Sequence, residues 1–432
     1  MNATPWSATG DTASRPRLRG HLRCDVAVVG AGLTGLTAAA ELARLAPDLR
    51  IAVVEADHVA AGASGRGTGL LGPRVGPPVA VARRRFGDDV ARAAHLWSVE
   101  AVRTVLALIE EYQIECDLTQ GGQLVVAPDE AAAQTQQREA DAARALELPI
   151  TPVAQRELPP FARGYLGALR YEPAATLDPA ALTGQLARIA EQRGVTIYER
   201  SPVREVRPGL LTTVRADEGE LAADHVVVAL NAYGGIPGTP RGVFGLRVQA
   251  GVTGKLTPQA LAALEGLRGD PVIEHGELSP YFRLTADDRI VVGGGVVRRG
   301  TLGSLAPAPG RLRAAVRALA PELSDVDIES AWAGPVGMTR DGLPVVGADP
   351  REPGIFHVGG CNGHGLAVSV SNGAHVARWI ATGEKDHLSF ALPWLRPKAP
   401  WIPRGGLADR VLDGYLARLS AGQSDRPTER LS

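Results

Sequence analysis

The chain has 432 residues, which is too long for one small domain and indicates two or three. Hydrophobic residues make up 45% and charged residues 22%, an ordinary globular balance that argues against a disordered chain. Because 46 basic side chains face 47 acidic ones, the net charge of −1 provides no electrostatic footprint for nucleic acid.

The cysteines and the apolar segments restrict the cellular setting. Cys24, Cys116 and Cys361 have no C-x-x-C spacing, so we expect no metal site and no disulfide framework, which fits a reducing cytoplasm. Residues 1–22 lack the apolar centre of a secretory signal and are expected to form a disordered arm, with an organelle transit peptide as the alternative. The longest stretch without charged residues, 353–377, contains six glycines and three histidines, so we expect no membrane span.

In chain order, the first ordered element is a short apolar run, residues 26–29, which is typical of a buried parallel strand. Helical spacing over 36–45 is followed by a second apolar run over 51–54. Strand, helix and strand together predict a βαβ unit of about thirty residues.

The rest of the chain indicates mixed helices and strands. Asp178 and Pro179 are typical of the N-cap and first residue of a helix that ends at Gly194. Alternating residues between 243 and 297 predict antiparallel strands. The remaining expectations are helices over 81–115, 129–146, 311–319 and 366–380, strands over 123–127, 196–198, 203–206 and 226–230, and a loosely packed tail beyond Asp386.

A glycine-rich turn joins the first strand to the first helix. Gly30, Gly32 and Gly35 form G-x-G-x-x-G, which lets backbone N–H groups and the helix N-terminus meet a pyrophosphate. Glu55 lies twenty residues after Gly35, where a carboxylate accepts hydrogen bonds from both ribose hydroxyls. The turn predicts dinucleotide binding without separating FAD from NAD.

The segment after the second strand, AAGASGRGTG at 60–69, resembles the flavin loop of FAD-dependent amine oxidoreductases of the D-amino-acid oxidase superfamily. The branch with glycine and sarcosine oxidases is the most similar, and within it the gamma-glutamylputrescine oxidoreductase-like group. The resemblance covers roughly residues 22 to 400. It continues through DPAAL at 178–182, GVTIYERSPV at 194–203, ADHVVVALNAY at 223–233, YFRLT at 281–285, IVVGGG at 290–295, WAGPVGMTRDGLPVVG at 332–347 and GGCNGHGL at 359–366.

This resemblance implies a fold of two interleaved parts. One is a Rossmann-like α/β FAD-binding domain of the glutathione-reductase type, over 23–85, 178–240 and 328–383. The other is an α+β substrate domain with an antiparallel sheet, over 86–177 and 241–327. Residues 384–432 form the C-terminal tail.

The resemblance also implies which residues hold FAD. The loop at 62–69 would lie against the pyrophosphate and the flavin edge, Val203 would hold the adenine by its backbone, and the start of the last helix would face the flavin N1–C2=O end. The implied set is Gly30, Gly32, Thr34, Gly35, Glu55, Ala56, Ala63, Ser64, Gly65, Arg66, Thr68, Gly69, Val203, Asn231, Gly334, Gly360, Gly363, His364, Gly365 and Leu366.

Three residues are candidates for positioning the substrate. Tyr281 and Arg283 are two apart on an expected strand and so share one face. Arg283 would bind a substrate carboxylate or, equally, form a buried structural salt bridge at the domain junction. His364 is interpreted first as a structural, hydrogen-bonded histidine and second as an acid or base.

Some positions depart from the branch. Its two lysines, one assisting the reaction with oxygen and one holding a substrate carboxylate, fall at Val291 and Ala367. Its flavin-tethering cysteine falls near Gly334, and the tethering histidine of the dimethylglycine dehydrogenase type falls near Arg66, so FAD should be noncovalent.

The resulting hypothesis is a soluble enzyme that oxidises the C–N bond of a primary or secondary amine or amino acid. Hydride would pass to flavin N5, and the imine would hydrolyse to a carbonyl. The expected partner is therefore a small amine or amino acid, with oxygen or another electron acceptor; an oligomer is left open. Two alternatives are kept: a flavin-binding subunit without turnover of its own, and an NAD-dependent dehydrogenase.

Overall fold

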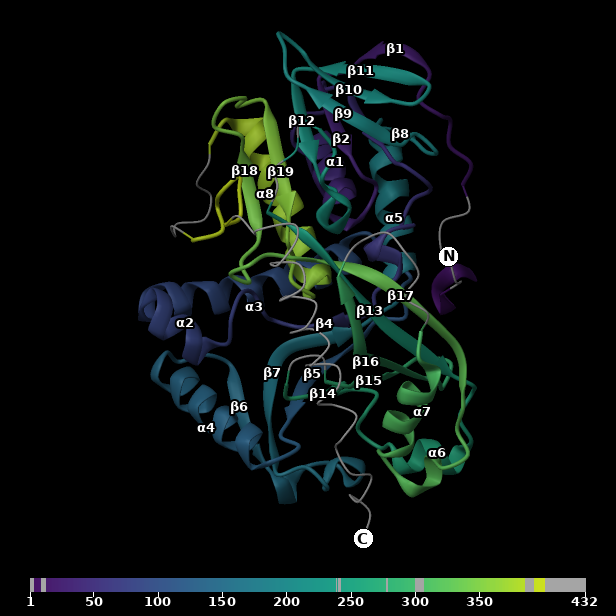
Figure 1. Cartoon of the computed structure of the whole chain (residues 1–432), viewed down its shortest axis with the longest axis vertical. Helices are drawn as coiled ribbons and strands as arrows, with labels where there is room; N and C mark the ends of the chain where they lie inside the picture. Colours follow the sequence, from purple (N-terminus) through teal and green to yellow (C-terminus); the bar gives the residue numbers. More distant parts are fainter. Residues whose placement is uncertain are drawn as a thin grey trace, which may run out of the picture.

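The computed structural model describes residues 4–8, 13–237, 239, 242–276, 279–299, 307–384 and 392–400, with the backbone alone for 295–299. Its strands form three sheets over this part of the chain. Two of them lie at one end of the molecule and the third at the other, with helix α3 crossing between (Figure 1).

The first sheet contains the βαβ unit. Val26–Val29 and Ile51–Val54 are fully buried, parallel and adjacent, which confirms the two strands predicted from apolar runs. The sheet has the order β18-β19-β12-β2-β3-β8 and is parallel except for the pairing of β18 with β19. Its strands are β2 Val26–Val29, β3 Ile51–Val54, β8 Thr196–Tyr198, β12 His225–Val228, β18 Val345–Ala348 and β19 Ile355–Gly359.

A second, four-stranded sheet stands beside the first. Its order is β1-β11-β10-β9. The strands are β1 Gly20–Arg23, β9 Val203–Arg207, β10 Thr212–Ala216 and β11 Gly219–Ala223.

The third sheet is largely antiparallel, with one parallel pairing between β14 and β5. Its order is β17-β13-β16-β15-β14-β5-β7-β4, and β6 adds to β7. Pairing therefore places β4 and β17 in this sheet, although their residues fall in ranges that the sequence assigned to the FAD-binding part. The strands are β4 Leu70–Leu71, β5 Thr119–Val126, β6 Ile150–Ala154, β7 Gly167–Thr176, β13 Phe244–Thr253, β14 Val272–Glu274, β15 Tyr281–Leu284, β16 Ile290–Arg299 and β17 Ile328–Met338.

The helices follow their sequence signals closely. Asp178 accepts hydrogen bonds from the N–H groups of Ala180 and Ala181, so it caps α5 as predicted. The expected helix over 81–115 is two helices, because Gly87 has a φ of +85° and interrupts it. The helices are α1 Leu33–Leu45, α2 Val79–Phe86, α3 Asp88–Glu111, α4 Glu130–Ala145, α5 Pro179–Gln192, α6 Pro258–Ala263, α7 Pro309–Arg317 and α8 Gly365–Thr382. No helix in the described part of the chain is both long and apolar enough to cross a membrane.

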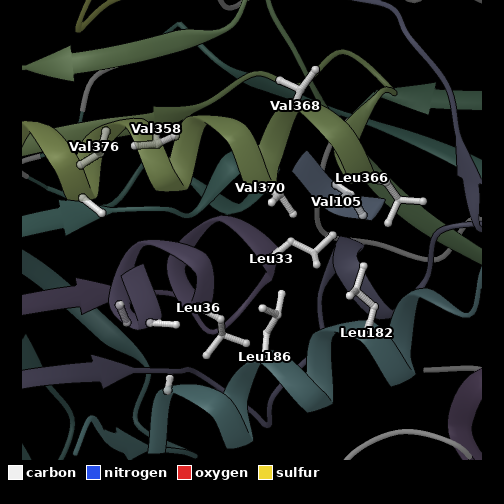
Figure 2. Close-up of a cluster of buried hydrophobic side chains, with 14 of the residues drawn as sticks. Leu33, Leu36, Val105, Leu182, Leu186, Val358, Leu366, Val368, Val370 and Val376 are labelled. Carbon is white, nitrogen blue, oxygen red and sulfur yellow. The ribbon is translucent and has the colours of Figure 1, made fainter. Parts of the chain in front are cut away.

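The largest apolar core lies where four helices meet. Leu33 and Leu36 of α1 lie between side chains of α8 and of α5, with Val105 of α3 nearby (Figure 2). Helices α1 and α8 approach closely because position 373 is glycine: a Cβ there would lie 2.5 Å from the Thr34 carbonyl oxygen. This packing fixes the N-termini of both helices relative to each other.

The prediction of a disordered arm over 1–22 is wrong for the residues described. Pro5–Ala8 is a 3-10 helix, and Gly20–Arg23 pairs in parallel with β11. Trp6 and Leu18 are buried at 5% and 1% exposure. Two apolar anchors thus hold a segment whose Ser-, Thr- and Arg-rich composition suggested disorder.

The loose packing predicted beyond Asp386 is also wrong for residues 392–400. Trp394 is fully buried and its ring lies 5.2 Å from that of Trp97 on α3. Arg396 forms a two-pronged ion pair with Asp341 at 2.6 and 2.8 Å. The rest of the predicted tail, 385–391 and 401–432, lies outside the described residues.

Candidate functional site

The glycine turn between β2 and α1 leaves no room for side chains. A Cβ on Gly35 would overlap the carbonyl oxygen of Gly30, and one on Gly32 would lie 2.9 Å from Ser64 Oγ. Gly30 itself has a φ of +107°, which favours glycine. The N-terminus of α1 is therefore open to a close ligand, as pyrophosphate binding requires.

Glu55 stands at the end of β3 beside this turn. Its Oε2 accepts from the N–H of Ala31 at 2.8 Å and its Oε1 from the N–H of Asp57 at 3.0 Å. Burial raises the pKa of this carboxyl, opposed by those backbone N–H groups. Each oxygen keeps a second lone pair, so the carboxylate can still accept from ribose hydroxyls.

The loop at 63–69 lies against one face of the third sheet. The Trp332 indole Nε1 donates to the Arg66 carbonyl at 2.9 Å, and the Arg66 side chain covers Gly334, whose Cβ would lie 3.4 Å from Arg66 Cβ. The Ser64 hydroxyl on the other side accepts from the N–H of Leu33 at 3.0 Å. The loop thus joins the sheet to the start of α1.

Tyr281 and Arg283 reach the same loop from β15. Arg283 Nε donates to the Thr68 carbonyl at 2.5 Å, and its Nη2 donates to the Leu177 carbonyl at 3.1 Å. The Tyr281 hydroxyl lies near the side chain of Thr68, which lowers its pKa against the larger, raising effect of burial. Both predicted residues therefore lie at the loop, on one face of the sheet.

Arg283 is 2% exposed, and its guanidinium Nε and Nη2 donate hydrogen bonds to backbone carbonyls. Burial lowers its pKa to about 10, while the negative charges of Asp178 and Asp117 oppose this shift. A Cβ on Gly69 would lie 2.8 Å from Arg283 Nη2, so the loop and the guanidinium are in close contact. This geometry favours a structural role, with carbonyls rather than carboxylates as partners.

Arg283 also supplies a positive charge near Val291, the position of one of the missing lysines. Residues 283 and 291 are direct cross-strand partners of β15 and β16. Val291 itself is fully buried among apolar side chains. Ala367, the position of the other missing lysine, is buried inside α8.

His364 immediately precedes α8. His364 keeps some solvent exposure. Burial of its imidazole, followed by a smaller contribution from the charge of Arg74, nevertheless lowers its pKa to about 3. The side chain is therefore neutral at physiological pH. The first N–H groups of α8, which follow it, are directed outward at the positive end of an 18-residue helix.

Asn231 connects the segments around α8. It has a φ of +45°, accepts from the N–H of Gly360 at 2.9 Å, and its amide lies 3.4 Å from Cys361 Sγ. Its side chain also fills the space beside Gly337, where a Cβ would overlap it. Burial raises the pKa of the Cys361 thiol, which fits packing rather than redox chemistry.

The other predicted cofactor residues fall around the same region. Val203 opens β9 at the edge of the four-stranded sheet. Thr34, Ala56 and Ala63 lie beside the glycine turn, after β3 and at the start of the loop. Gly65, Gly363, Gly365 and Leu366 belong to the loop and to the start of α8.

Sequence reasoning did not single out Arg74. It follows β4, is exposed, and its side chain has no hydrogen bond or ion pair with any described residue. Its positive charge contributes to lowering the pKa values of His364 and His275, in each case after the larger effect of burial. A lone arginine among glycines and prolines directly after the flavin loop was the signal that would have found it.

A polar cavity of about 320 Å³ lies elsewhere, between residues 115–117 and α5. Asp117, Asp178 and Arg188 are among the residues that line it. None of the predicted cofactor residues lines this cavity.

Residues 25–379 match the family model DAO: FAD dependent oxidoreductase. The chain belongs to this family. It is 30% identical to gamma-glutamylputrescine oxidoreductase of Escherichia coli over 87% of both chains, and 25% identical to glycine oxidase of Geobacillus kaustophilus over 86% of this chain and 95% of that one. The crystal structure of the latter enzyme superposes with a TM-score of 0.75 at 22% identity, over 88% of this chain and all of that chain.

Membership confirms the predicted family, the fold class and the FAD-dependent oxidoreductase activity. It also supports FAD over the nicotinamide alternative. The residues present fit this cofactor, because the turn at Gly30–Gly35 and the loop at Gly69 have no space for a Cβ and Glu55 stands beside them. No cysteine or histidine stands at Gly334 or Arg66, the positions expected for a covalent tether.

Proposed function

We propose that the protein oxidises the C–N bond of an amine or amino acid, with noncovalently bound FAD. The observation that carries the proposal is a contact between the loop at 63–69 and the third sheet. We call these the cofactor loop and the substrate sheet. Through Tyr281 and Arg283 the sheet face meets the loop at Thr68. The relatives reported above are named for oxidation of an amine and of an amino acid, which supports this substrate class.

Bound FAD supplies the acceptor for the hydrogen and the two electrons that the substrate carbon loses. The chain contributes orientation and exclusion of water. The turn at Gly30–Gly35, Glu55 and the loop hold the cofactor, while the α8 N-terminus stabilises negative charge. Neutral His364 carries no positive charge at neutral pH, so one ring nitrogen can donate a hydrogen bond and the other can accept one. The oxidised product is an imine, which water hydrolyses to a carbonyl compound and an amine or ammonia.

Arg74 is our candidate for recognition of a substrate carboxylate. The Arg74 guanidinium has no side-chain partner among the described residues, and a guanidinium binds a carboxylate through paired hydrogen bonds. Its charge contributes to lowering the pKa values of His364, just before α8, and of His275, just after β14, so it acts near the start of α8. Arg283 serves instead to position the loop, since its donors are engaged by carbonyls.

The proposal extends to location and electron acceptor. The free cysteines Cys24 and Cys116 suit the reducing cytoplasm. Oxygen or another acceptor takes the electrons from the reduced enzyme. Oxygen consumption, measured against reduction of an artificial quinone, separates these two acceptors.

The test is anaerobic bleaching of the bound flavin at about 450 nm by a panel of amines, amino acids, hydroxy acids and NADH. We expect bleaching by members of the first two classes only. For an amino acid that bleaches the flavin, Arg74→Gln should raise KM by at least about tenfold and leave kcat nearly unchanged. Bleaching by hydroxy acids or NADH alone, or by nothing in the panel, would contradict the proposed reaction.

A further inference from the structure

The cofactor loop has contacts with the very start of the chain. The indole Nε1 of Trp6 donates to the Gly67 carbonyl at 2.9 Å. The Thr4 hydroxyl donates to the Gly65 carbonyl at 3.5 Å. Together with the bonds from Trp332 and Arg283, four successive carbonyls of the loop are bound by side chains that come from outside it.

Trp6 is buried at the junction of the two parts of the molecule. It packs in an apolar cluster with residues of α5, β13, β16 and β17, next to which the purple N-terminal segment lies in Figure 1. The guanidinium carbon of Arg283 lies 4.9 Å from the centre of the indole. The cluster consists of Trp6, Ala180, Ala250, Val252, Val291 and Trp332.

These contacts control the direction of the loop's N–H groups. In a trans peptide the C=O of one residue and the N–H of the next are directed oppositely. Binding of the Gly67 carbonyl by Trp6 therefore turns the Thr68 N–H to the far side of the loop. Binding of the Arg66 carbonyl by Trp332 does the same for the Gly67 N–H. Within the described residues, neither N–H has an acceptor, so both are available to a ligand.

A second anchor, independent of Trp6, holds the same arm in place. Arg15 makes a two-pronged ion pair with Glu191 of α5 at 2.7 and 2.9 Å, and a further bond to Glu199 at 3.1 Å. Glu199 in turn accepts from the N–H of Val59, shortly before the loop. The arm thus contacts the cofactor loop directly through Trp6 and is connected to Val59, before the loop, through Glu199.

We propose that Trp6 is a positioning residue of the FAD site, which holds the peptide at 67–68 so that the loop presents its N–H groups to the cofactor. Trp6 lies outside the part of the chain that matches the family, which begins at residue 25. The N-terminal arm is accordingly part of the FAD site of this chain.

The test measures FAD affinity, which does not depend on which substrate is oxidised. FAD is removed from the full-length holoprotein and titrated back while flavin fluorescence and the visible spectrum are recorded. Trp6→Phe keeps most of the buried ring but loses the N–H, and we expect its Kd for FAD to rise about five- to tenfold. Trp6→Ala should weaken FAD binding at least as much and alter the fine structure of the 450 nm band.

Leu18→Ala is the matched control. Leu18 is 1% exposed on the same arm, but it packs in the core between the first two sheets, away from the loop. We expect it to lower the Tm of the apoprotein while leaving the Kd for FAD within about twofold of wild type. The proposal is overturned if Trp6→Phe and Trp6→Ala keep wild-type affinity, or if Leu18→Ala weakens FAD as much as Trp6→Ala does.

Discussion

The ring of Tyr281 lies across Gly293, its partner on the neighbouring strand, so closely that a Cβ at position 293 would overlap the phenol. Glycine at 293 is therefore what allows the ring to lie flat and its hydroxyl to reach Thr68. This pair connects the geometry of the substrate sheet to that of the cofactor loop.

The first prediction follows from this overlap. Gly293→Ala should push the Tyr281 ring off the sheet and move its hydroxyl away from Thr68, lowering kcat/KM about tenfold or more. Tyr281→Phe keeps the ring in place and should cost less. Steady-state kinetics with an amine that bleaches the flavin would measure both. Gly164→Ala, at an exposed site with open space for a Cβ, should leave kcat/KM unchanged. Equal activities of the two alanine variants would show that the overlap is relieved at no cost.

The second prediction concerns two glycines in helices, for which the same substitution should have opposite signs. Alanine is favoured over glycine in a helix by about 0.5–1 kcal/mol. In α8, a Cβ on Gly373 would lie 2.5 Å from the Thr34 carbonyl oxygen of α1, and this overpacking costs about 1–3 kcal/mol. In α7, Gly310 has open space. Urea denaturation should therefore show Gly373→Ala destabilised and Gly310→Ala neutral or stabilised; a stabilised Gly373→Ala would contradict the close packing of α1 and α8.

Local signals in the sequence predicted the turn, the acid and the helix cap that belong to the candidate cofactor site. The turn at Gly30–Gly35, the acid at Glu55 and the cap at Asp178 each act over a few residues, and each stands where it was expected. The family resemblance located the loop and the start of α8. These are the features for which backbone chemistry within one segment determines the structure.

Long-range packing set the features that the sequence did not reveal. Trp6 and Trp394 are single aromatic residues whose sequence neighbours are polar or proline-rich. Their burial is explained only by packing against residues from distant parts of the chain. Strand β5 begins at Thr119 instead of near 123 because its pairing with β7 extends over the glycine pair at 121–122. The carbonyl partners of Arg283 also come from distant segments, so a carboxylate was an equally reasonable expectation.

The third prediction concerns the buried ion pairs of the arm. Arg15 and Glu199 have side chains only 3% and 4% exposed. Removing the guanidinium with Arg15→Met leaves Glu199 buried without its cation, which should cost about 3–5 kcal/mol. Arg204→Met removes an exposed pair with Asp217 and should cost no more than about 1 kcal/mol.

Urea denaturation of the two holoproteins measures this difference. Adding Glu199→Gln to Arg15→Met should restore part of the lost stability, because it removes the uncompensated charge. Similar losses for Arg15→Met and Arg204→Met would mean that water reaches Glu199 in the folded protein.

The last prediction concerns acid sensitivity. His95 is 6% exposed, lies 6.3 Å from the Tyr171 ring, and has no partner for Nε2 among the described residues. Burial lowers its pKa from 6.5 to about 4. Between these values the unfolded chain binds a proton that the folded protein does not, so stability is full above pH 6.5 and falls as the pH approaches 4. The difference between the pKa values of His95 in the unfolded and folded states corresponds to about 3 kcal/mol in the free energy of unfolding.

His95→Phe keeps an aromatic ring in this space and removes the titrating group. Its free energy of unfolding should therefore fall less steeply than that of wild type when urea midpoints are compared at pH 7 and pH 4.5. Some acid sensitivity will persist, since burial also lowers the pKa of His357 to about 4. His58→Asn, at an exposed position, should follow the wild-type pH dependence. If His95→Phe and wild type lose stability in parallel, His95 takes up its proton as readily in the folded protein as in the unfolded chain.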